Sequence, residues 1–320
     1  MTAHRLKPLA PVTLGVMLLI VGCSGGSSGS ESATGLMSLS VSDAPVQDLQ
    51  QVCIEFTEVE FKKAGSDNQL ITFNPPAKID LLAYQGMNAA PLITDEKLEA
   101  GEYQWVRLTV NAAQGGNGGA GAGMNDTECL GAGSYIVTKT GEIHGLFVPS
   151  GEESGLKLNR GFTLPEGGRA DFVAEFDLMK SIHAPEGLDP DYIMRPTIRL
   201  LDRTETGSIA GEVSMGLATQ TGCMPAVYLY AAGEAPDDNE NDGEMDSIDP
   251  IASAMVNMQN DGRYLYEIGP LLAGMMYDVA FSCDADDPDA DEMLNYELSA
   301  DNPVEVFANQ QAIANFLLPF

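Results

Sequence analysis

Acidic residues alternate along one segment in the last third of the chain, ahead of Gly243. Carboxylates at this spacing before a glycine bend can wrap a Ca²⁺ ion, which prefers hard oxygen ligands. The segment matches an EF-hand loop only in part, because no helical pattern flanks it. The predicted ligands are Asp238, Glu240, Asp242, Asp246 and Asp249.

A second acidic cluster follows Cys283 directly and includes the further predicted ligands Asp284 and Asp286. A bridge from Cys223 to Cys283 would bring this cluster near the first one, where the like charges would repel each other without a cation. The sequence therefore predicts calcium and no other cofactor. The alternative is that both segments are solvated loops, because the chain contains 47 Asp and Glu residues throughout its length.

The residues that perform catalysis in other proteins form no recognisable arrangement in this chain. Neither His144 nor His183 has a Ser or Cys nucleophile directly beside it. The run Gly116-x-Gly118-x-x-Gly121 matches a dinucleotide fingerprint, but it lacks the preceding strand and the following helix, so we expect a loop. The sequence indicates a protein that is not an enzyme. Because acids are so abundant, a carboxylate-dependent extracytoplasmic hydrolase is the alternative.

Aromatic side chains are the usual contacts of a sugar-binding surface, and here they are expected inside the protein. Trp105 is the only tryptophan and falls in an alternating strand, so we expect it in a core. Two pairs of tyrosines each share one face of a strand and are expected to pack within a β-sandwich; they are Tyr228 with Tyr230 and Tyr264 with Tyr266.

Cys23 ends a short apolar run that follows Arg5 and Lys7, and a Ser/Gly tract comes after it. This layout resembles a bacterial lipoprotein signal, and the apolar run has signal-peptide length rather than the length of a membrane span. We therefore predict a signal peptide at residues 1–22 and a lipidated Cys23 with a flexible tether over residues 23–35. The lipid would anchor the protein in the bacterial cell envelope, and Ser24 favours the outer membrane.

The four remaining cysteines form an even set, which in an exported protein indicates disulfides. Three connectivities are possible, and we favour Cys53–Cys129 with Cys223–Cys283 because neither bridge crosses between the predicted domains. Zinc is the rival interpretation, but the chain has no C-x-x-C motif and few histidines.

The chain is strongly acidic, with 16 Lys and Arg against 47 Asp and Glu and a formal net charge of −31. Cleavage before Cys23 would remove two of the cations and none of the acids. This charge argues against nucleic acid and against anionic lipid headgroups as partners. The expected partners are the membrane, through the lipid anchor, and an envelope protein or glycan.

Period-two alternation of apolar residues predicts strands along most of the chain, whereas helical periodicity is scarce. A register change within residues 52–61 predicts a β-bulge, and residues 79–84 and 89–92 are expected to form short helices or turns. The predicted strands of the first half are 37–42, 52–61, 102–110, 135–138, 143–148, 155–164, 170–178 and 193–201.

A polar joint at residues 202–206 separates a second set of short strands. The sequence therefore predicts an all-β fold of two antiparallel β-sandwich domains in tandem, over residues 36–203 and 207–320. The strands predicted for the second domain are 208–214, 226–231, 252–258, 263–268, 277–283, 304–307 and 312–318.

Six separated motifs of the first domain occur in an order that is similar to a known family. They are Ser-Val-Ser-Asp-Ala-Pro-Val at 40–46, Asp-Leu-Leu at 80–82, Leu-Glu-Ala-Gly-Glu-Tyr at 98–103, Pro-Ser-Gly at 149–151 leading to Ser-Gly-Leu-Lys-Leu at 154–158, Phe-Asp-Leu-Met-Lys-Ser at 176–181 and Arg-Pro-Thr-Ile-Arg-Leu at 195–200. Residues 36–202 thus resemble the bacterial lipoprotein family with domain of unknown function 4382. The resemblance implies a β-rich exported domain and no particular reaction.

Cationic side chains stand out in or beside these motifs because the chain is so acidic. We expect them to pair with Asp43 or Asp177 at a strand end, and the alternative is an anion-binding site. They are Lys157, Arg160, Arg195 and Arg199.

The second domain is similar to transthyretin-like and carboxypeptidase-regulatory-like sandwiches at residues 207–213, 261–264 and 277–280. The resemblance implies a spacer, an adhesion unit or a sugar-binding accessory. From all these features we expect a lipid-anchored cell-envelope protein with a non-catalytic binding, adhesion or structural role, stabilised by calcium.

Overall fold

The structure is a computed structural model of the chain. It describes residues 32–44, 49–115, 118–122, 128–149, 151, 155–184, 191–234, 236–237, 249–284 and 294–317. The chain divides into two compact units, Met1–Ser32 and Ala33–Phe320, and the description below concerns the second. The predicted signal peptide and Cys23 lie outside the described residues. Within the described part, no helix is long and apolar enough to cross a membrane.

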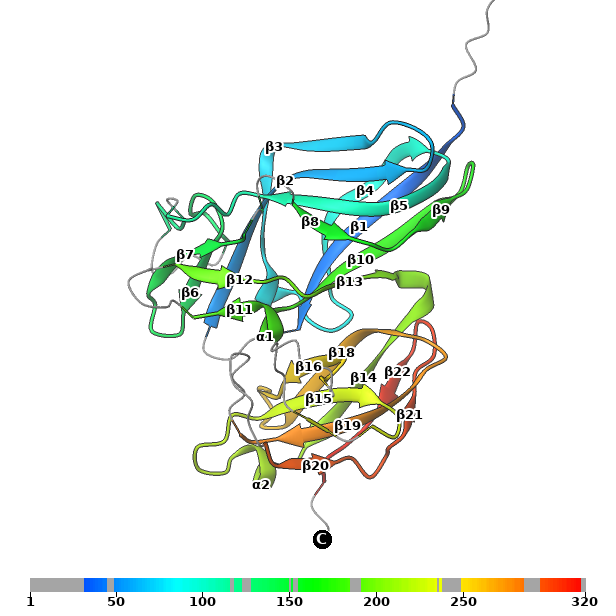
Figure 1. Ribbon diagram of the computed structural model, residues 1–320. Coiled ribbons are helices and arrows are strands. Elements are labelled where there is room, and N and C mark those ends of the chain that lie inside the picture. Colours follow the sequence, from blue (N-terminus) through cyan, green and yellow to red (C-terminus); the bar gives the residue numbers. More distant parts are fainter. Residues whose placement is uncertain are drawn as a thin grey trace, which may run out of the picture. The chain divides into compact units, whose positions relative to one another are not determined.

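The described residues up to 202 form a four-stranded and a nine-stranded sheet (Figure 1). The four-stranded sheet has the order β13 (Ile198–Asp202), β10 (Arg169–Asp177), β1 (Thr34–Ala44), β4 (Ala90–Glu99). The nine-stranded sheet has the order β11 (Ile182–His183), β12 (Tyr192–Met194), β7 (Ile143–Phe147), β6 (Tyr135–Thr138), β2 (Leu49–Lys63), β5 (Gly101–Val110), β8 (Leu156–Leu158). Beside this path, β3 (Gln69–Asp80) pairs with β2, and β9 (Phe162–Leu164) pairs with β5. The short helices are η1 (Leu81–Ala83), α1 (Leu178–Ser181) and η2 (Arg203–Glu205).

These two sheets share one apolar core. Alternate residues of β1, such as Met37 and Leu39, are fully buried in it. The rings of Phe56 on β2 and Phe176 on β10 lie 6.4 Å apart, edge to face, and so join the two sheets. Burial of each such side chain contributes about 1.5–3 kcal/mol to folding, so the alternation of apolar residues dictates which face of each strand turns inward.

The β-bulge expected within residues 52–61 is present. The pairing of β2 with both β3 and β5 shifts register between Phe56 and Glu58. Phe56 and Val59 both point into the core as a result, although they are three residues apart rather than two.

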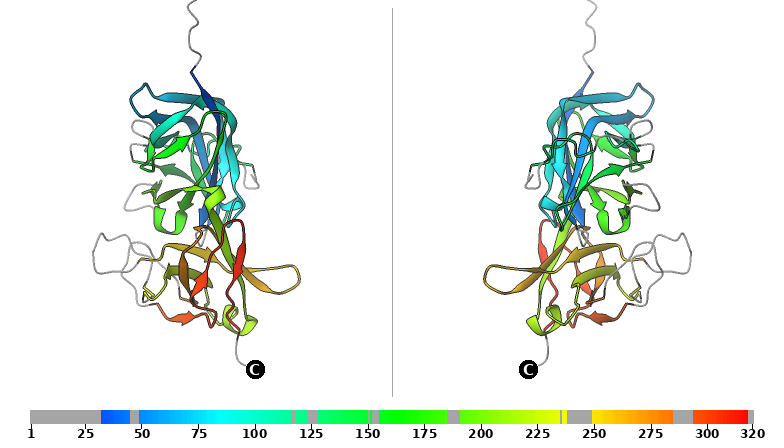
Figure 2. Two further views of the ribbon diagram at one scale, coloured as in Figure 1. Left: turned by 90° about the vertical axis from the view of Figure 1, so that its right-hand side faces the viewer. Right: turned by 90° about the vertical axis from the view of Figure 1, so that its left-hand side faces the viewer.

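The described residues from 206 onward form two further sheets, seen from the sides in Figure 2. One has the order β17 (Asn257–Met258), β18 (Tyr264–Leu272), β14 (Thr206–Val213), β22 (Gln311–Ile313). The other has the order β16 (Ala252–Met255), β15 (Ala226–Ala231), β19 (Met276–Ser282), β20 (Tyr296–Leu298), with β21 (Val304–Glu305) beside β19. The helix α2 (Met215–Ala218) follows β14. The core of this part includes Ile209, Val279, Phe281 and Phe316.

The all-β class predicted from the sequence is confirmed. The sheets are mixed, because β1–β10, β7–β12 and β14–β22 are parallel among the described strand pairs. Of residues 89–92, which were expected in a helix or turn, residues 90–92 instead begin β4, which is held by its backbone pairing to β1. The two apolar cores lie within residues 37–200 and 209–316, and the exact domain boundaries stay a prediction.

Candidate binding surface

Trp105 lies on the outward side of the nine-stranded sheet. Tyr103 and Val106 on the same strand are both buried in the core. Two residues, Gln104 and Trp105, lie between them where a regular strand would have one, and neither is buried. The pairing of β5 with β2 shifts register at this point. The shift is a β-bulge that turns the half-buried Trp105 away from the core. The expectation that Trp105 is a core residue was therefore wrong, because it assumed an unbroken period of two.

Tyr103 holds this register from the inner side of the strand. Its ring stacks on that of Phe162 with centroids 4.9 Å apart. Its hydroxyl donates to the carbonyl oxygen of Glu99 at 2.7 Å and accepts from Nε2 of Gln69 at 2.6 Å. Burial raises the pKa of Tyr103 to about 12, so the phenol stays a neutral donor at physiological pH. The bulge is therefore fixed by a buried, fully hydrogen-bonded ring.

Two cations lie over the ring of Trp105. Cζ of Arg107 is 4.7 Å and Nζ of Lys157 is 5.0 Å from the ring centroid. Arg107 and Lys157 are directly opposite each other in the pairing of β5 with β8. Gly155 leaves space for this arrangement, because a Cβ there would lie 2.8 Å from Cγ of Arg107. Both cations are within the distance at which cation–π attraction is effective.

The neighbouring residues on this side of the sheet are partly open to solvent. Glu60 on β2 lies opposite Arg107 and forms an ion pair with it at 3.1 Å. Leu70 on β3 lies opposite Glu60 and is 56% exposed. Lys62 lies opposite Trp105. We call this surface the Trp105 face, and its residues are Glu60, Lys62, Leu70, Trp105, Arg107 and Lys157.

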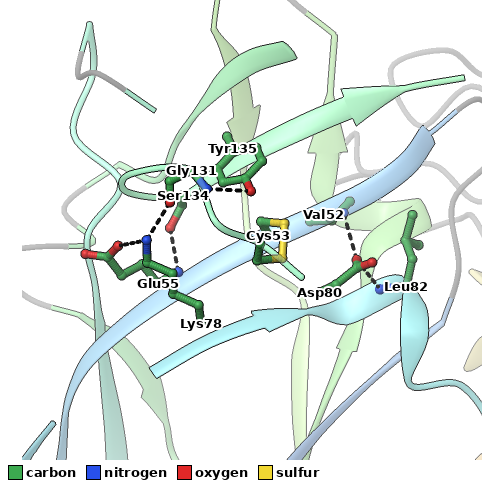
Figure 3. The surroundings of a disulfide bond; sticks show 10 residues. Val52, Cys53, Glu55, Lys78, Asp80, Leu82, Gly131, Ser134 and Tyr135 are labelled. Carbon is green, nitrogen blue, oxygen red and sulfur yellow. Dashed lines mark hydrogen bonds and ion pairs between the residues drawn. A yellow bond between two sulfur atoms is a disulfide. The ribbon is translucent and has the colours of Figure 1, made fainter. Parts of the chain in front are cut away.

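Both predicted disulfides are present in the structure. Cys53 and Cys129 join with a Cα–Cα distance of 5.5 Å and are almost completely buried beside Tyr135 (Figure 3). Cys223 and Cys283 join with a Cα–Cα distance of 4.5 Å and are half-buried. Disulfides persist in oxidising compartments, so the two bridges indicate an extracytoplasmic protein.

Glu55 organises the loop next to the first disulfide (Figure 3). Its Oε1 accepts from Nδ2 of Asn111 at 2.8 Å. Its Oε2 accepts from N of Gly133 at 3.1 Å and lies 3.2 Å from Nζ of Lys78. Its backbone N–H donates to Oγ of Ser134 at 3.0 Å. The carboxylate is therefore engaged by an amide, a backbone N–H and a cation.

A cavity of about 290 Å³ lies beside this loop and is lined by small residues, among them Ala112, Gly118 and Gly133. The predicted loop character of the glycine run agrees with the turns seen at Gly118 and Gly119. Close to the cavity wall, Oδ2 of Asp191 accepts from N of Gly115 at 2.8 Å. Asp191 thus holds backbone in place, as Glu55 does.

Three carboxylates lie buried together where β1 and β10 run side by side. Asp43 lies opposite Phe176 in this parallel pairing, so Glu175 and Asp177 are the residues of β10 on either side of its partner, and all three carboxylates are buried. Oδ1 of Asp43 accepts from N of Leu178, whereas its Oδ2 has no hydrogen-bond partner among the described residues. Burial, and then the charges of Asp177 and Glu175, raise the pKa of Asp43 well above its usual range. Burial and the charge of Glu175 raise the pKa of Asp177 to about 6.

We expect Asp43→Asn to raise the melting temperature above pH 7 and to flatten its dependence on pH. A carboxyl with a raised pKa in the folded state contributes stability that is present below its unfolded pKa and is lost as pH rises through the folded pKa. For Asp177 this window runs from 3.8 to about 6. For Asp43 it begins at 3.8 and extends well above it, because burial and the charges of Asp177 and Glu175 raise its pKa, and asparagine at this position removes that loss of stability. The change at pH 8 should be a few degrees.

Melting curves recorded from about pH 4 to pH 8 test this expectation. Asp67→Asn is the matched control, because it removes one carboxylate from an exposed loop and should leave the pH dependence unchanged. An Asp43→Asn curve that parallels the wild-type curve across the whole range would contradict the role given to Asp43.

The cations of the family-like motifs pair differently from the sequence-based expectation. Nε of Arg199 donates to Oε2 of Glu175 at 2.8 Å. Nη1 of Arg160 donates to the carbonyl oxygen of Leu200, and its other terminal nitrogen lies 3.6 Å from Glu205. Lys157 lies over Trp105. Direct pairing of these three with Asp43 or Asp177 was therefore a wrong expectation. Arg199 lies opposite Glu175 in the pairing of β10 with β13, and Lys157 lies opposite Arg107 in the pairing of β5 with β8.

The tyrosine pairs are buried in two different places. Tyr228 and Tyr230 are fully buried in a cluster with Tyr296 and with Met179 from α1, separate from the core between the sheets. Tyr266 lies in that core, where its hydroxyl donates to the carbonyl oxygen of Ala314 at 2.6 Å. Packing is thus the role that the structure supports for these tyrosines.

The predicted calcium ligands fall mostly outside the described residues, namely Asp238, Glu240, Asp242, Asp246 and Asp286. Of the other two, Asp249 forms an ion pair with Nζ of Lys180 at 2.9 Å, and Oδ2 of Asp284 accepts from both the backbone and side-chain nitrogens of Asn295. In the described part, no group of three or more His, Cys, Asp or Glu residues is arranged to hold a metal ion. Calcium binding stays a prediction.

Comparisons with known proteins identify one part of the chain. A family profile described as "Domain of unknown function (DUF4382)" matches residues 34–196, which is just over half of the chain and confirms the resemblance seen in its motifs. No curated protein matches the sequence. Solved structures with some similarity include a "putative adhesin" from Bacteroides ovatus, with 12% identity over 89% of both chains and a TM-score of 0.20. Another is the major pilin from Streptococcus pyogenes, with 11% identity over 90% of this chain and 100% of that chain and a TM-score of 0.14.

Proposed function

This chain belongs to the DUF4382 family, and from that premise we propose that it is a lipid-anchored, non-catalytic binding protein of the bacterial cell envelope. The single observation that supports binding is the Trp105 face. The only tryptophan of the chain is turned outward by a bulge and lies under two cations. A large amphipathic ring beside charged groups is typical of binding surfaces, where Trp and Arg are enriched.

The lipid anchor explains how such a surface would act. Cys23 would attach the chain to the membrane, and the tether that follows it would hold the folded part, which begins with β1 at Thr34, away from the membrane. Cys23→Ser is expected to move the protein from the membrane fraction to the soluble fraction of the envelope. A variant that stays in the membrane fraction would contradict the anchor.

Binding is tested by capture from detergent-solubilised envelope fractions with the intact chain. We expect wild-type protein to retain an envelope component that Trp105→Ala fails to retain. Tyr264→Ala is the matched control, because Tyr264 is a partly buried aromatic residue on a strand of the other core. Equal retention by all three proteins, or a substrate turned over at a rate that Trp105→Ala leaves unchanged, would overturn the proposal.

We further propose that calcium stabilises the acidic segments between residues 237 and 249 and after Cys283. Support comes from the alternating carboxylates of the sequence. A ligand that binds only the folded state stabilises it by about 2.7 kcal/mol at a hundred times its dissociation constant. We therefore expect millimolar calcium to raise the melting temperature, and EDTA to reverse the rise, whereas magnesium should have a smaller effect. Identical melting curves with calcium and with EDTA would contradict this proposal.

A further inference from the structure

The Trp105 face concentrates positive charge in a strongly acidic protein. The chain has 16 cations against 47 acids, yet Arg107 and Lys157 lie over one ring and Lys62 is opposite that residue on the neighbouring strand. Arg107 is partly neutralised by Glu60 at 3.1 Å. Nζ of Lys62 donates to the carbonyl oxygen of Ser66, and Lys157 has no ion pair within the described part of the chain. The local charge is therefore opposite in sign to that of the protein as a whole.

This charge pattern selects the sign of a ligand. An ammonium group that is already oriented by an aromatic ring forms a strong charge-assisted hydrogen bond with a carboxylate. Lys157 is exposed, so a carboxylate can reach it without displacing an ion-pair partner among the residues that the structure describes. The long-range repulsion from the remaining acids is screened beyond about 8 Å at physiological ionic strength, so a sparsely charged anion is not excluded. A densely charged polyanion such as nucleic acid would still be disfavoured.

The shape of the surface selects the kind of molecule. The Trp105 face crosses four neighbouring strands, from Leu70 on β3 through Glu60 on β2 and Arg107 on β5 to Lys157 on β8. Arg107 and Lys157 lie over the half-buried indole, so a sugar ring would contact the part of the indole that these cations leave open to solvent. An extended chain of sugars can lie across the strands and bring a carboxylate to Lys157.

We propose that the Trp105 face binds an acidic polysaccharide, with Trp105 contacting a sugar ring and Lys157, with Arg107, binding a uronate carboxylate. This inference rests on the proposed binding function and names its ligand class. Trp105 and Lys157 contact the ligand, and Glu60 positions the guanidinium of Arg107 through their ion pair. The bulge between β2 and β5 is then the structural feature that creates the site.

Titration calorimetry of the intact chain in detergent with hexagalacturonate tests this proposal. We expect Trp105→Ala to weaken binding about tenfold or more and Lys157→Gln by about three- to tenfold, in line with the strength of single aromatic and ionic contacts. Lys157→Gln should also reduce the dependence of affinity on salt. Trp105→Phe should bind with intermediate affinity and keeps an aromatic ring at this position if Trp105→Ala folds poorly. Arg263→Gln, which changes an exposed cation directly before β18, should bind as the wild type does.

Two further probes separate the alternatives. Maltohexaose, a neutral hexasaccharide, should bind far more weakly, and equal binding would overturn the requirement for a carboxylate. Poly-glutamate should bind weakly and independently of Trp105, and Trp105-dependent binding equal to that of hexagalacturonate would assign the face to acidic peptides instead. If hexagalacturonate does not bind while envelope capture still depends on Trp105, the inference fails and the proposed function stands.

Discussion

Replacing both Cys53 and Cys129 with Ser is expected to lower the free energy of unfolding by about 4 kcal/mol. The bridge closes a loop with a sequence separation of 76, and without it the unfolded chain gains the corresponding conformational entropy. The folded state also loses an anchor, because Cys129 lies just before the segment in which Gly133 and Ser134 hydrogen-bond to Glu55. Equilibrium denaturation followed by tryptophan fluorescence measures the change, since Trp105 is the only tryptophan.

The second bridge provides the matched comparison. Cys223 and Cys283 have a similar sequence separation of 60, but they pack against the other core. Replacing this pair with Ser should therefore shift the circular dichroism transition of the strands around it and leave the fluorescence transition of Trp105 near its wild-type midpoint. If both double variants moved the fluorescence midpoint equally, the stabilisation would not be local to each core.

Arg199→Met is expected to destabilise the protein by about 3 kcal/mol, because it leaves Glu175 as a buried carboxylate without its partner. The Glu175 side chain is 2% exposed, and its Oε2 lies 2.8 Å from Nε of Arg199. Burial lowers the pKa of Arg199, but the charge of Glu175 and the hydrogen bond to it outweigh burial and raise the pKa. Asp43 and Asp177 lie close enough to Glu175 to add repulsion once the cation is removed.

Arg263→Met tests whether breaking any ion pair lowers stability or whether the loss requires a buried pair. Arg263 and Asp261 also form an Nε–Oδ2 contact of 2.8 Å, but both side chains are 54% exposed. Its removal should leave the denaturation midpoint unchanged, because exposed pairs are screened by water and salt. The double variant Glu175→Leu/Arg199→Met should recover most of the stability lost in Arg199→Met, since no uncompensated charge is left. Equal effects of Arg199→Met and Arg263→Met would contradict the role given to the buried pair.

Strands that are apolar on one side were predicted well from the sequence. The strand predicted at 135–138 matches β6, and the bulge within β2 was visible because Phe56 and Val59 break the period of two. By contrast, β3 and β4 were missed. Residues of β3 are mostly exposed or half-buried, and β4 contains Asp95, Glu96 and Lys97, so neither strand shows a continuous apolar alternation. Their strand structure comes from backbone pairing with β2 and β1, which has no local signal.

The position of Trp105 could not be read in the same way as that of Phe56. Tyr103, Trp105 and Val106 are all compatible with an inward side chain, so the alternation of β5 is ambiguous. The choice depends on the stacking of Tyr103 on Phe162 and on the two hydrogen bonds of its hydroxyl, which join segments far apart in the sequence. The cations over the ring come from β5 itself and from β8, and only their cross-strand pairing brings them together.

The sequence by itself determined the all-β class and the family of residues 34–196, because these depend on local periodicity and ordered motifs. It left three disulfide connectivities open and favoured the one that the structure has. The tertiary structure decided which side of β5 presents Trp105 and which carboxylate forms an ion pair with Arg199. Both depend on strand register, and a shift of one residue exchanges the two faces of a strand. Register is determined by contacts between distant segments, so the candidate site became visible only in the folded chain.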